Sequence, residues 1–292
     1  MTKPGVALAI MVLLTGPAAA QTPSGPISVV AAENFYGDVA QQIVGTGASV
    51  SSILSNPDQD PHLFEASPST ARLLSAASIV VYNGADYDPW MAKLLAASRS
   101  PNRKIIIVAN LVHRKTGDNP HLWYDPPTMP AYAEALTDAL AERDPAHRTD
   151  YQARQAAFLA SLQPMQATIA DIRARFAGIA VSATEPVFGY MATALGFKMR
   201  NERFQLAVMN NTEPRASDVA AFENDLRKHT VRLMFYNSQA SDPAAQRLVQ
   251  IARQSRIPVV GVTETEPPGK TYQDWMTGEL DAVVQALANP PQ

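Results

Sequence analysis

Two of the five histidines in this sequence occur in nearly the same short motif. His62 and His121 each stand in a Pro-His-Leu-aromatic tetrapeptide that follows a turn-rich segment. The proline restricts the backbone before the ring, and the leucine and the aromatic side chain can pack behind it. Imidazole nitrogen is a common ligand of first-row divalent metals. The paired motifs therefore predict a shared metal-binding role, although either histidine alone could simply bond a backbone carbonyl.

Two carboxylates in the second half of the chain occupy a comparable position. Glu185 follows the predicted strand 179–183, and Glu264 follows the predicted strand 258–262, with Glu266 two residues further on. By position alone, each acid could also be a helix-start or surface residue. Two neutral imidazoles and two carboxylates would together balance the charge of one divalent cation.

The other residues that could do this chemistry are few. The chain has no cysteine, which excludes disulfides, a thiolate nucleophile and any cysteine-based metal site. Any metal must then be held by histidines and carboxylates. His113 follows the predicted strand 104–108 and could be an auxiliary metal contact, whereas His147 and His229 are expected to be solvated at the ends of amphipathic helices.

The predicted elements place these residues at the edges of two sheets. Short apolar segments alternate with amphipathic ones in both halves of the chain, which predicts α/β structure with two parallel sheets. The predicted strands are 27–32, 50–54, 79–82 and 104–108, then 179–183, 203–208, 233–236 and 258–262. Open α/β sheets bind ligands at the carboxyl ends of their strands, where the histidines and acids are expected.

The segment between the two halves shows no strand pattern. Residues 145–178 carry one apolar stripe at helical spacing, which predicts a long connecting helix bent at Pro164, or two helices broken there. The expected organisation is a lobe over 27–144, the connecting helix over 145–178 and a second lobe over 179–292. Such a helix would resist wide hinge motion between the lobes.

The N-terminus has the pattern of an export signal. Lys3 precedes an apolar run over 6–14, and small residues before Gln21 fit cleavage near Ala20. A weak membrane anchor is the alternative. We expect residues 1–20 to be removed and the protein to act in the periplasm. The net charge of −3, without a basic stripe, argues against nucleic acid as a partner.

Taken in order, the motifs resemble a known family. Residues 60–68 fit D-P-H-x-(F/Y)-E-x-S-P, residues 119–126 fit N-P-H-x-W-x-D-P, and residues 185–190 fit (H/E)-P-x-F-G-Y. A late strand then ends in an acidic residue. This order resembles the metal-binding solute receptors of ABC transporters, the TroA-like zinc/manganese family. The resemblance covers nearly all of residues 27–288.

The resemblance implies a monomeric receptor, not an enzyme, that captures a divalent metal between two lobes and passes it to an ABC permease in the membrane. By position it assigns His62 and His121 to the first lobe and Glu185 and Glu264 to the second. Glu266 is the alternative fourth ligand, because the match around the late strand is looser. The acid at position 125 matches a residue that we interpret as orienting the loop.

The resemblance implies that the bound metal is Mn²⁺, Fe²⁺ or Zn²⁺. Glu185 stands where many zinc receptors have histidine, and the segment 114–119 lacks the histidine-rich loop of many of them. Hard oxygen ligands suit Mn²⁺, although Zn²⁺ binds a given site more tightly in a bare competition. Because ligand histidines must be neutral, affinity should fall below about pH 6.

Three other functions remain as alternative hypotheses. One is a receptor for a metal chelate or another small ligand, in a cleft lined by Phe35, Tyr36, Tyr87 and Trp123. Another is an exported metallo-hydrolase, which would need an open coordination position and a general base. The sequence contains no H-E-x-x-H motif and no Gly-rich phosphate loop. Nothing in the sequence supports or excludes an adhesin role on the same scaffold.

Overall fold

The computed structural model describes residues 26–56, 64, 67–240 and 242–289. His62 and the predicted export signal over 1–20 lie outside the described residues. Within the described residues, no helix combines the length and the apolar character needed to span a bilayer.

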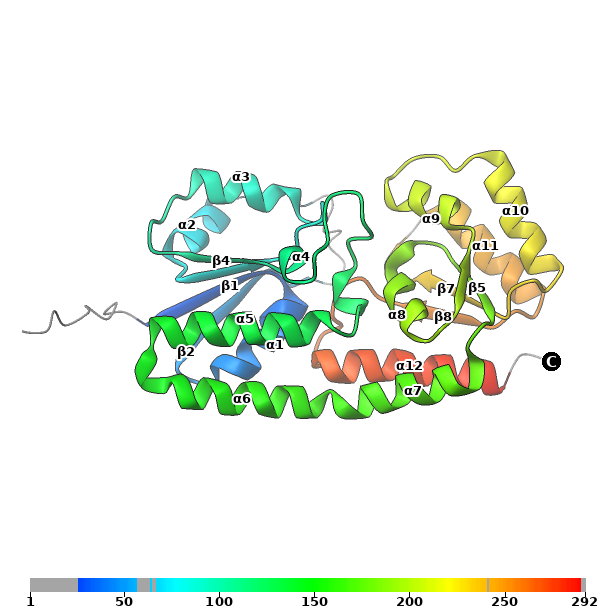
Figure 1. Ribbon diagram of the computed structural model, residues 1–292. Helices are drawn as coiled ribbons and strands as arrows, with labels where there is room; N and C mark the ends of the chain where they lie inside the picture. Colours follow the sequence, from blue (N-terminus) through cyan, green and yellow to red (C-terminus); the bar gives the residue numbers. More distant parts are fainter. Residues whose placement is uncertain (1–25, 57–63, 65–66, 241, 290–292) are drawn as a thin grey trace, which may run out of the picture.

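The first half of the chain forms a parallel four-stranded sheet in the order β2-β1-β3-β4, with helices on both faces (Figure 1). Its elements are β1 (Ile27–Glu33), α1 (Asn34–Val44), β2 (Ala48–Leu54), α2 (Pro68–Ala76), β3 (Ile79–Tyr82), α3 (Pro89–Ala97), β4 (Lys104–Ile107), α4 (Val108–Leu111), η2 (Leu122–Tyr124) and α5 (Thr128–Arg143). Alternate residues of β1 face different cores, because successive side chains of a strand point to opposite faces. Val29 and Ala31 pack in the core that contains α1 and α5, while Val30 and Ala32 pack with α2 and α3.

The second half repeats this plan in a parallel sheet of order β6-β5-β7-β8. Its elements are β5 (Ala180–Ala183), η4 (Pro186–Phe188), α8 (Gly189–Ala194), β6 (Lys198–Arg200), α9 (Glu202–Met209), α10 (Ala216–Arg227), β7 (Leu233–Asn237), α11 (Pro243–Gln254), β8 (Val259–Val262) and α12 (Tyr272–Ala288). The expected architecture of two α/β lobes with parallel sheets is confirmed.

One predicted strand is wrong. Residues 203–208 lie within helix α9, and the strand of this region is the shorter β6. Asn201 adopts a left-handed backbone conformation with φ of 60° between the two elements. Phe204 and Val208 are four residues apart and are both buried in one core, which is helical spacing. The apolar residues of this segment therefore follow the helical period. In so short a segment, residues four apart also fit the alternation of a strand, which explains the wrong prediction.

The connection between the lobes is a bent pair of helices. The short helix η3 (Pro145–His147) leads into α6 (Arg148–Ser161), and α7 (Gln163–Phe176) follows after the single residue Leu162. Pro164 lies in the first turn of α7, where a missing N–H leaves no helical hydrogen bond unmade. Figure 1 shows α6 and α7 running beneath both lobes, with α12 alongside α7. The division at residues 144/145 and 178/179 is our proposal for the domain boundaries.

One aromatic core continues from the first lobe into the second. Phe35 stacks on Trp123 with ring centroids 4.3 Å apart, and Tyr124 next to it lies 5.5 Å from Phe188. Phe188 in turn stacks on Phe235 of β7 at 4.4 Å. Because close-packed interiors resist shear, this continuous core favours small relative movements of the lobes.

Candidate metal-binding site

His121 is fully buried at the start of η2, at the boundary between the two lobes. Its Nδ1 lies 2.7 Å from Oδ1 of Asn119, and its backbone N–H donates to the same oxygen at 3.1 Å. Its Nε2 is buried and makes no hydrogen bond within the described part of the chain. One ring nitrogen is therefore held by Asn119, while the other faces Oε1 of Glu264 in the second lobe.

The amide of Asn119 decides which ring nitrogen carries the proton. Its Nδ2 donates to the carbonyl oxygen of Pro186 at 2.8 Å, so the other end of the amide must be the oxygen. An amide oxygen only accepts hydrogen bonds, so Nδ1 of His121 is the donor. In the neutral ring, Nε2 then carries a lone pair, which is the form that binds a metal.

Glu264 presents an oxygen to this lone pair. The residue follows β8, is 8% exposed, and has Oε1 at 3.4 Å from Nε2 of His121. Its other oxygen accepts from Nδ2 of Asn237 at 3.1 Å, and its backbone N–H donates to Oε1 of Gln239 at 2.7 Å. Two ligand atoms about 2.1 Å from one metal at a tetrahedral angle are about 3.4 Å apart. The spacing therefore fits two ligands of a single cation.

Glu266 has different surroundings. Its backbone N–H donates to Oδ1 of Asn34, and its carbonyl oxygen accepts from the Nδ2 of the same residue at 2.7 Å. Burial, and then the charge of Asp38, raise the pKa of Glu266 to about 9. Of the two acids after β8, Glu264 is the one beside His121.

Glu185 lies one residue from the contact that supports His121. It is 9% exposed, two residues after the end of β5 and directly before Pro186, whose carbonyl accepts from Asn119. Gly189 allows this approach, because a Cβ at that position would lie 2.9 Å from Nδ2 of Asn119. The hydrogen bond between Asn119 and Pro186 thus joins the loop of His121 to the loop of Glu185.

The set of four metal ligands, His62, His121, Glu185 and Glu264, stays a prediction. His62 lies outside the described residues, and the described residues by themselves contain no cluster of three or more potential metal ligands. His113, His147 and His229 are exposed; Nδ1 of His147 lies 2.6 Å from Oδ2 of Asp144. Asp125 forms an ion pair with Arg114 at 3.3 Å, consistent with the interpretation that it orients the loop.

A second amide supports the His121 loop from inside the first lobe. Asn83 is fully buried after β3, and its Nδ2 donates to the carbonyl oxygen of Pro120 at 2.9 Å. Its Oδ1 accepts from the hydroxyl of Tyr36 at 2.6 Å, and its N–H donates to Asp88 at 2.7 Å. The sequence pattern did not indicate a role for Asn83, and it contained Asn119 only as part of the N-P-H motif. An amide directly before Pro-His was the one available signal.

The four aromatic residues considered as cleft walls are core residues. Phe35, Tyr36, Tyr87 and Trp123 are each 0% exposed. Tyr87 and Trp123 lie edge-on to the ring of His121, with centroids 6.0 and 5.4 Å away. They pack behind the imidazole rather than line a ligand-sized opening.

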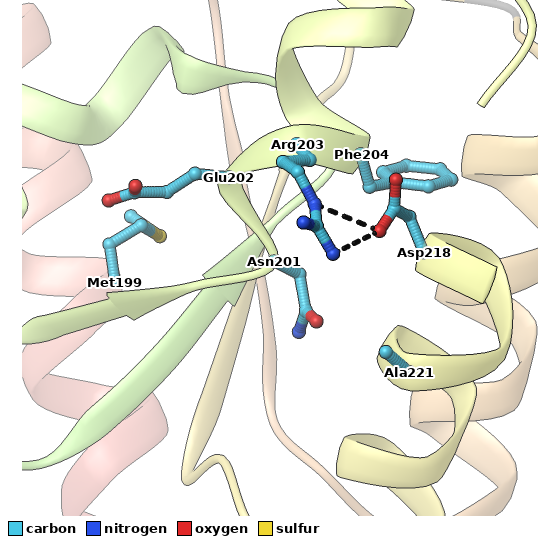
Figure 2. A pocket seen from close by; sticks show the side chains of 7 residues that line it. All are labelled: Met199, Asn201, Glu202, Arg203, Phe204, Asp218 and Ala221. Carbon is cyan, nitrogen blue, oxygen red and sulfur yellow. Dashed lines mark hydrogen bonds and ion pairs between the residues drawn. The ribbon is translucent and has the colours of Figure 1, made fainter. Parts of the chain in front are cut away.

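A hollow of about 360 Å³ lies elsewhere, on the second lobe beside α9 and α10 (Figure 2). Figure 2 shows its polar wall, where Arg203 reaches Asp218 at 2.8 Å. None of the proposed metal ligands lines this hollow.

Comparison with known proteins shows the family of this chain. Residues 29–286 match the family ZnuA, described as the zinc-uptake complex component A, periplasmic. The chain belongs to this family. The family description and the names of its relatives denote binding components of metal transporters, so the chain is a substrate-binding protein and not an enzyme.

Individual relatives are distant but match over most of their length. The metal ABC transporter substrate-binding lipoprotein ScbA of Streptococcus cristatus is 22% identical, over 92% of this chain and 91% of that protein. The manganese-binding lipoprotein MntA of Halalkalibacterium halodurans is 24% identical, over 90% and 89%.

Solved structures share the fold. The periplasmic zinc binding protein TroA from Treponema pallidum has a TM-score of 0.76 at 20% identity, covering 91% of this chain and 100% of that one. A Mn-bound periplasmic metal binding protein from Candidatus Liberibacter asiaticus has a TM-score of 0.70 at 20% identity, covering 89% and 99%.

Proposed function

We propose that this chain captures one divalent transition-metal ion between its lobes and delivers it to an ABC permease. The supporting observation is the buried pair formed by Nε2 of His121 and Oε1 of Glu264, 3.4 Å apart and from different lobes. Both atoms are electron-pair donors when the ring is neutral and the carboxylate ionised. The two lone pairs repel each other at this distance, and a cation bound by both atoms replaces the repulsion by attraction.

The proposed ligands are His62, His121, Glu185 and Glu264. A site closed by four side chains leaves no open position for an activated water, which suits capture rather than hydrolysis. Several relatives are named for manganese, iron or unspecified metals, while the family model and the TroA structure are named for zinc, so these names support a divalent transition metal as the ligand.

We favour Mn²⁺ or Fe²⁺ over Zn²⁺ as the physiological ion, because two of the four proposed ligands are hard carboxylates. The proposed location is the periplasm, after cleavage of the export signal near Ala20. The proposed partner is the membrane permease, which the chain meets as a monomer.

Equilibrium dialysis of the mature protein tests the proposal directly. We expect one bare Mn²⁺, Fe²⁺ or Zn²⁺ ion per chain, bound more weakly as the pH falls through the ordinary range of histidine titration. Binding of a metal chelate but not of any bare ion would support the rival receptor reading instead.

Asn119→Ala is expected to weaken metal binding about 10–100-fold, the usual effect of losing a hydrogen bond to a ligating imidazole. The substitution removes the acceptor that keeps the proton on Nδ1 and the link to Pro186. Gly189→Ala should act in the same direction, since its Cβ would displace the amide. Isothermal titration with Mn²⁺ measures both. Wild-type affinity in Asn119→Ala would contradict the proposed support of His121.

Glu185→His is expected to shift relative affinity from Mn²⁺ toward Zn²⁺, because a nitrogen ligand replaces a hard oxygen. Competition dialysis of the two metals measures the ratio in wild type and variant. Glu202→His, at an exposed residue of α9, is the matched control and should leave the ratio unchanged. An unchanged ratio in Glu185→His would remove this residue from the proposed set.

A further inference from the structure

Glu279 on α12 is a buried acid outside the proposed ligand set that contacts both lobes. Its Oε1 accepts from the backbone N–H of Thr263 at 3.0 Å and from Nε1 of Trp275 at 2.9 Å. Its Oε2 lies 2.8 Å from the hydroxyl of Tyr124. Thr263 directly precedes Glu264, and Tyr124 follows His121 by three residues. The carboxyl group therefore joins the two loops that carry the facing metal ligands.

The hydrogen atoms available at this junction determine the protonation state of Glu279. The hydroxyl of Tyr124 lies 2.7 Å from the carbonyl oxygen of Thr263 as well as 2.8 Å from Oε2 of Glu279. The hydroxyl of Tyr124 has one proton, and a carbonyl oxygen only accepts hydrogen bonds. If Glu279 is ionised, this single proton must therefore serve both contacts. A proton on Oε2 can instead be donated to Tyr124, whose own proton is donated to Thr263. The neutral carboxyl gives each of these two contacts of the Tyr124 hydroxyl its own proton.

Burial acts in the same direction. It raises the pKa of Glu279 to about 7, against the opposing effect of the donors from Thr263, Tyr124 and Trp275. The titratable neighbours are the buried hydroxyls of Tyr124 and Tyr272. Helix α7, which packs against α12, buries the apolar residues Met165 and Ile172. Two charged groups lie near Tyr272: Asp125 from the first lobe, and Asp38 of α1, which accepts a hydrogen bond from the backbone N–H of Tyr272 at 2.9 Å.

We propose that the neutral carboxyl of Glu279 and the hydroxyl of Tyr124 form an interlobe clamp that positions Glu264 relative to His121. Glu279 is thus a positioning residue, because it acts through the loops and does not itself touch the ion. The inference rests on the proposed metal site, and it adds a group that ties the geometry of that site to pH.

The sign of the pH effect follows from the raised pKa. The clamp contributes fully to the free energy of unfolding below the ordinary glutamate pKa of about 4.5, and its contribution is lost as the pH rises through about 7. Glu279→Gln keeps the shape of the neutral acid, because its amide can donate to Tyr124 while its oxygen accepts from Thr263 and Trp275. This variant should hold the clamp closed at every pH.

The first test uses metal-free protein and the indole N–H signals of the three tryptophans in a nitrogen-15 NMR spectrum. Trp275→Phe identifies the signal of Trp275. We expect this signal to move with a midpoint near pH 7 in wild type and to stay in place in Glu279→Gln. A signal that does not titrate in wild type, or that titrates equally in Glu279→Gln, overturns the clamp.

The second test measures Mn²⁺ affinity near pH 6.5. Tyr124→Phe and Glu279→Ala should each weaken binding at least about tenfold, and together no more than the larger single effect. Glu279→Gln should stay within about threefold of wild type. Asp281→Asn, which removes an exposed charge from the same helix, is the control for charge alone and should have no effect.

The outcomes separate the two proposals. Equal losses in Glu279→Gln and Glu279→Ala, or wild-type affinity in Tyr124→Phe, overturn the positioning role. Absence of Mn²⁺, Fe²⁺ and Zn²⁺ binding by wild type overturns the proposed function and with it the positioning role, while the tryptophan titration still decides whether the clamp exists.

Discussion

His121→Ala is expected to abolish metal-dependent stabilisation. Wild-type protein with Mn²⁺ at 100 times its Kd should gain about 2.7 kcal/mol, which is about 5 °C in melting temperature for a chain of this size. The variant loses the lone pair at Nε2 that faces Glu264, so its affinity should fall more than about 100-fold, beyond the usual effect of an outer hydrogen bond. Calorimetric melting with and without Mn²⁺, Fe²⁺ or Zn²⁺ gives the shift.

Each variant is compared with its own metal-free melting temperature, because truncating a buried ring also destabilises the protein. His113→Asn is the matched control. His113 is exposed and has φ of 56°, a left-handed conformation that asparagine tolerates. The control should keep the full shift. Retention of the shift in His121→Ala would refute the proposed site.

Glu264→Gln is expected to reduce metal affinity more than about 100-fold, whereas Glu266→Gln should stay within about threefold of wild type. Both substitutions keep the size of the side chain and remove its ability to ionise. Glu264 directs Oε1 at His121, while Glu266 is attached to Asn34 and faces Asp38. Isothermal titration with Mn²⁺ compares the two variants directly.

The pair of variants makes the assignment decisive, since the two acids are two residues apart in one loop. A larger loss in Glu266→Gln would move the fourth ligand to that residue. Small and equal effects would mean that neither carboxylate binds the ion, and would leave the second lobe represented by Glu185 alone.

Much of the fold could be predicted from local sequence. Periodic apolar segments indicated the strands of both sheets and the connecting region, because each pattern depends only on neighbours in the chain. The exception, residues 203–208, is a short segment in which Phe204 and Val208 fit a helix as well as a strand. The connecting region is divided into two helices at Leu162, close to the break at Pro164 that was one of the two alternatives, because a proline can begin a helix as readily as it can bend one.

The candidate site divides differently between sequence and structure. Residue types and spacing made His62, His121, Glu185 and Glu264 candidates, because imidazoles and carboxylates suit a divalent ion and each is expected after a strand, and the family resemblance assigned them as one ligand set. Only the tertiary structure placed Glu264, and not Glu266, beside His121, and only it showed how the amide of Asn119 directs the imidazole. Those outcomes depend on hydrogen bonds between residues far apart in the chain, such as Asn237 to Glu264 and Asn119 to Pro186. A linear pattern carries no information on such contacts, since they form only when elements far apart in the chain pack together, within the second lobe for Asn237 and Glu264 and between the lobes for Asn119 and Pro186.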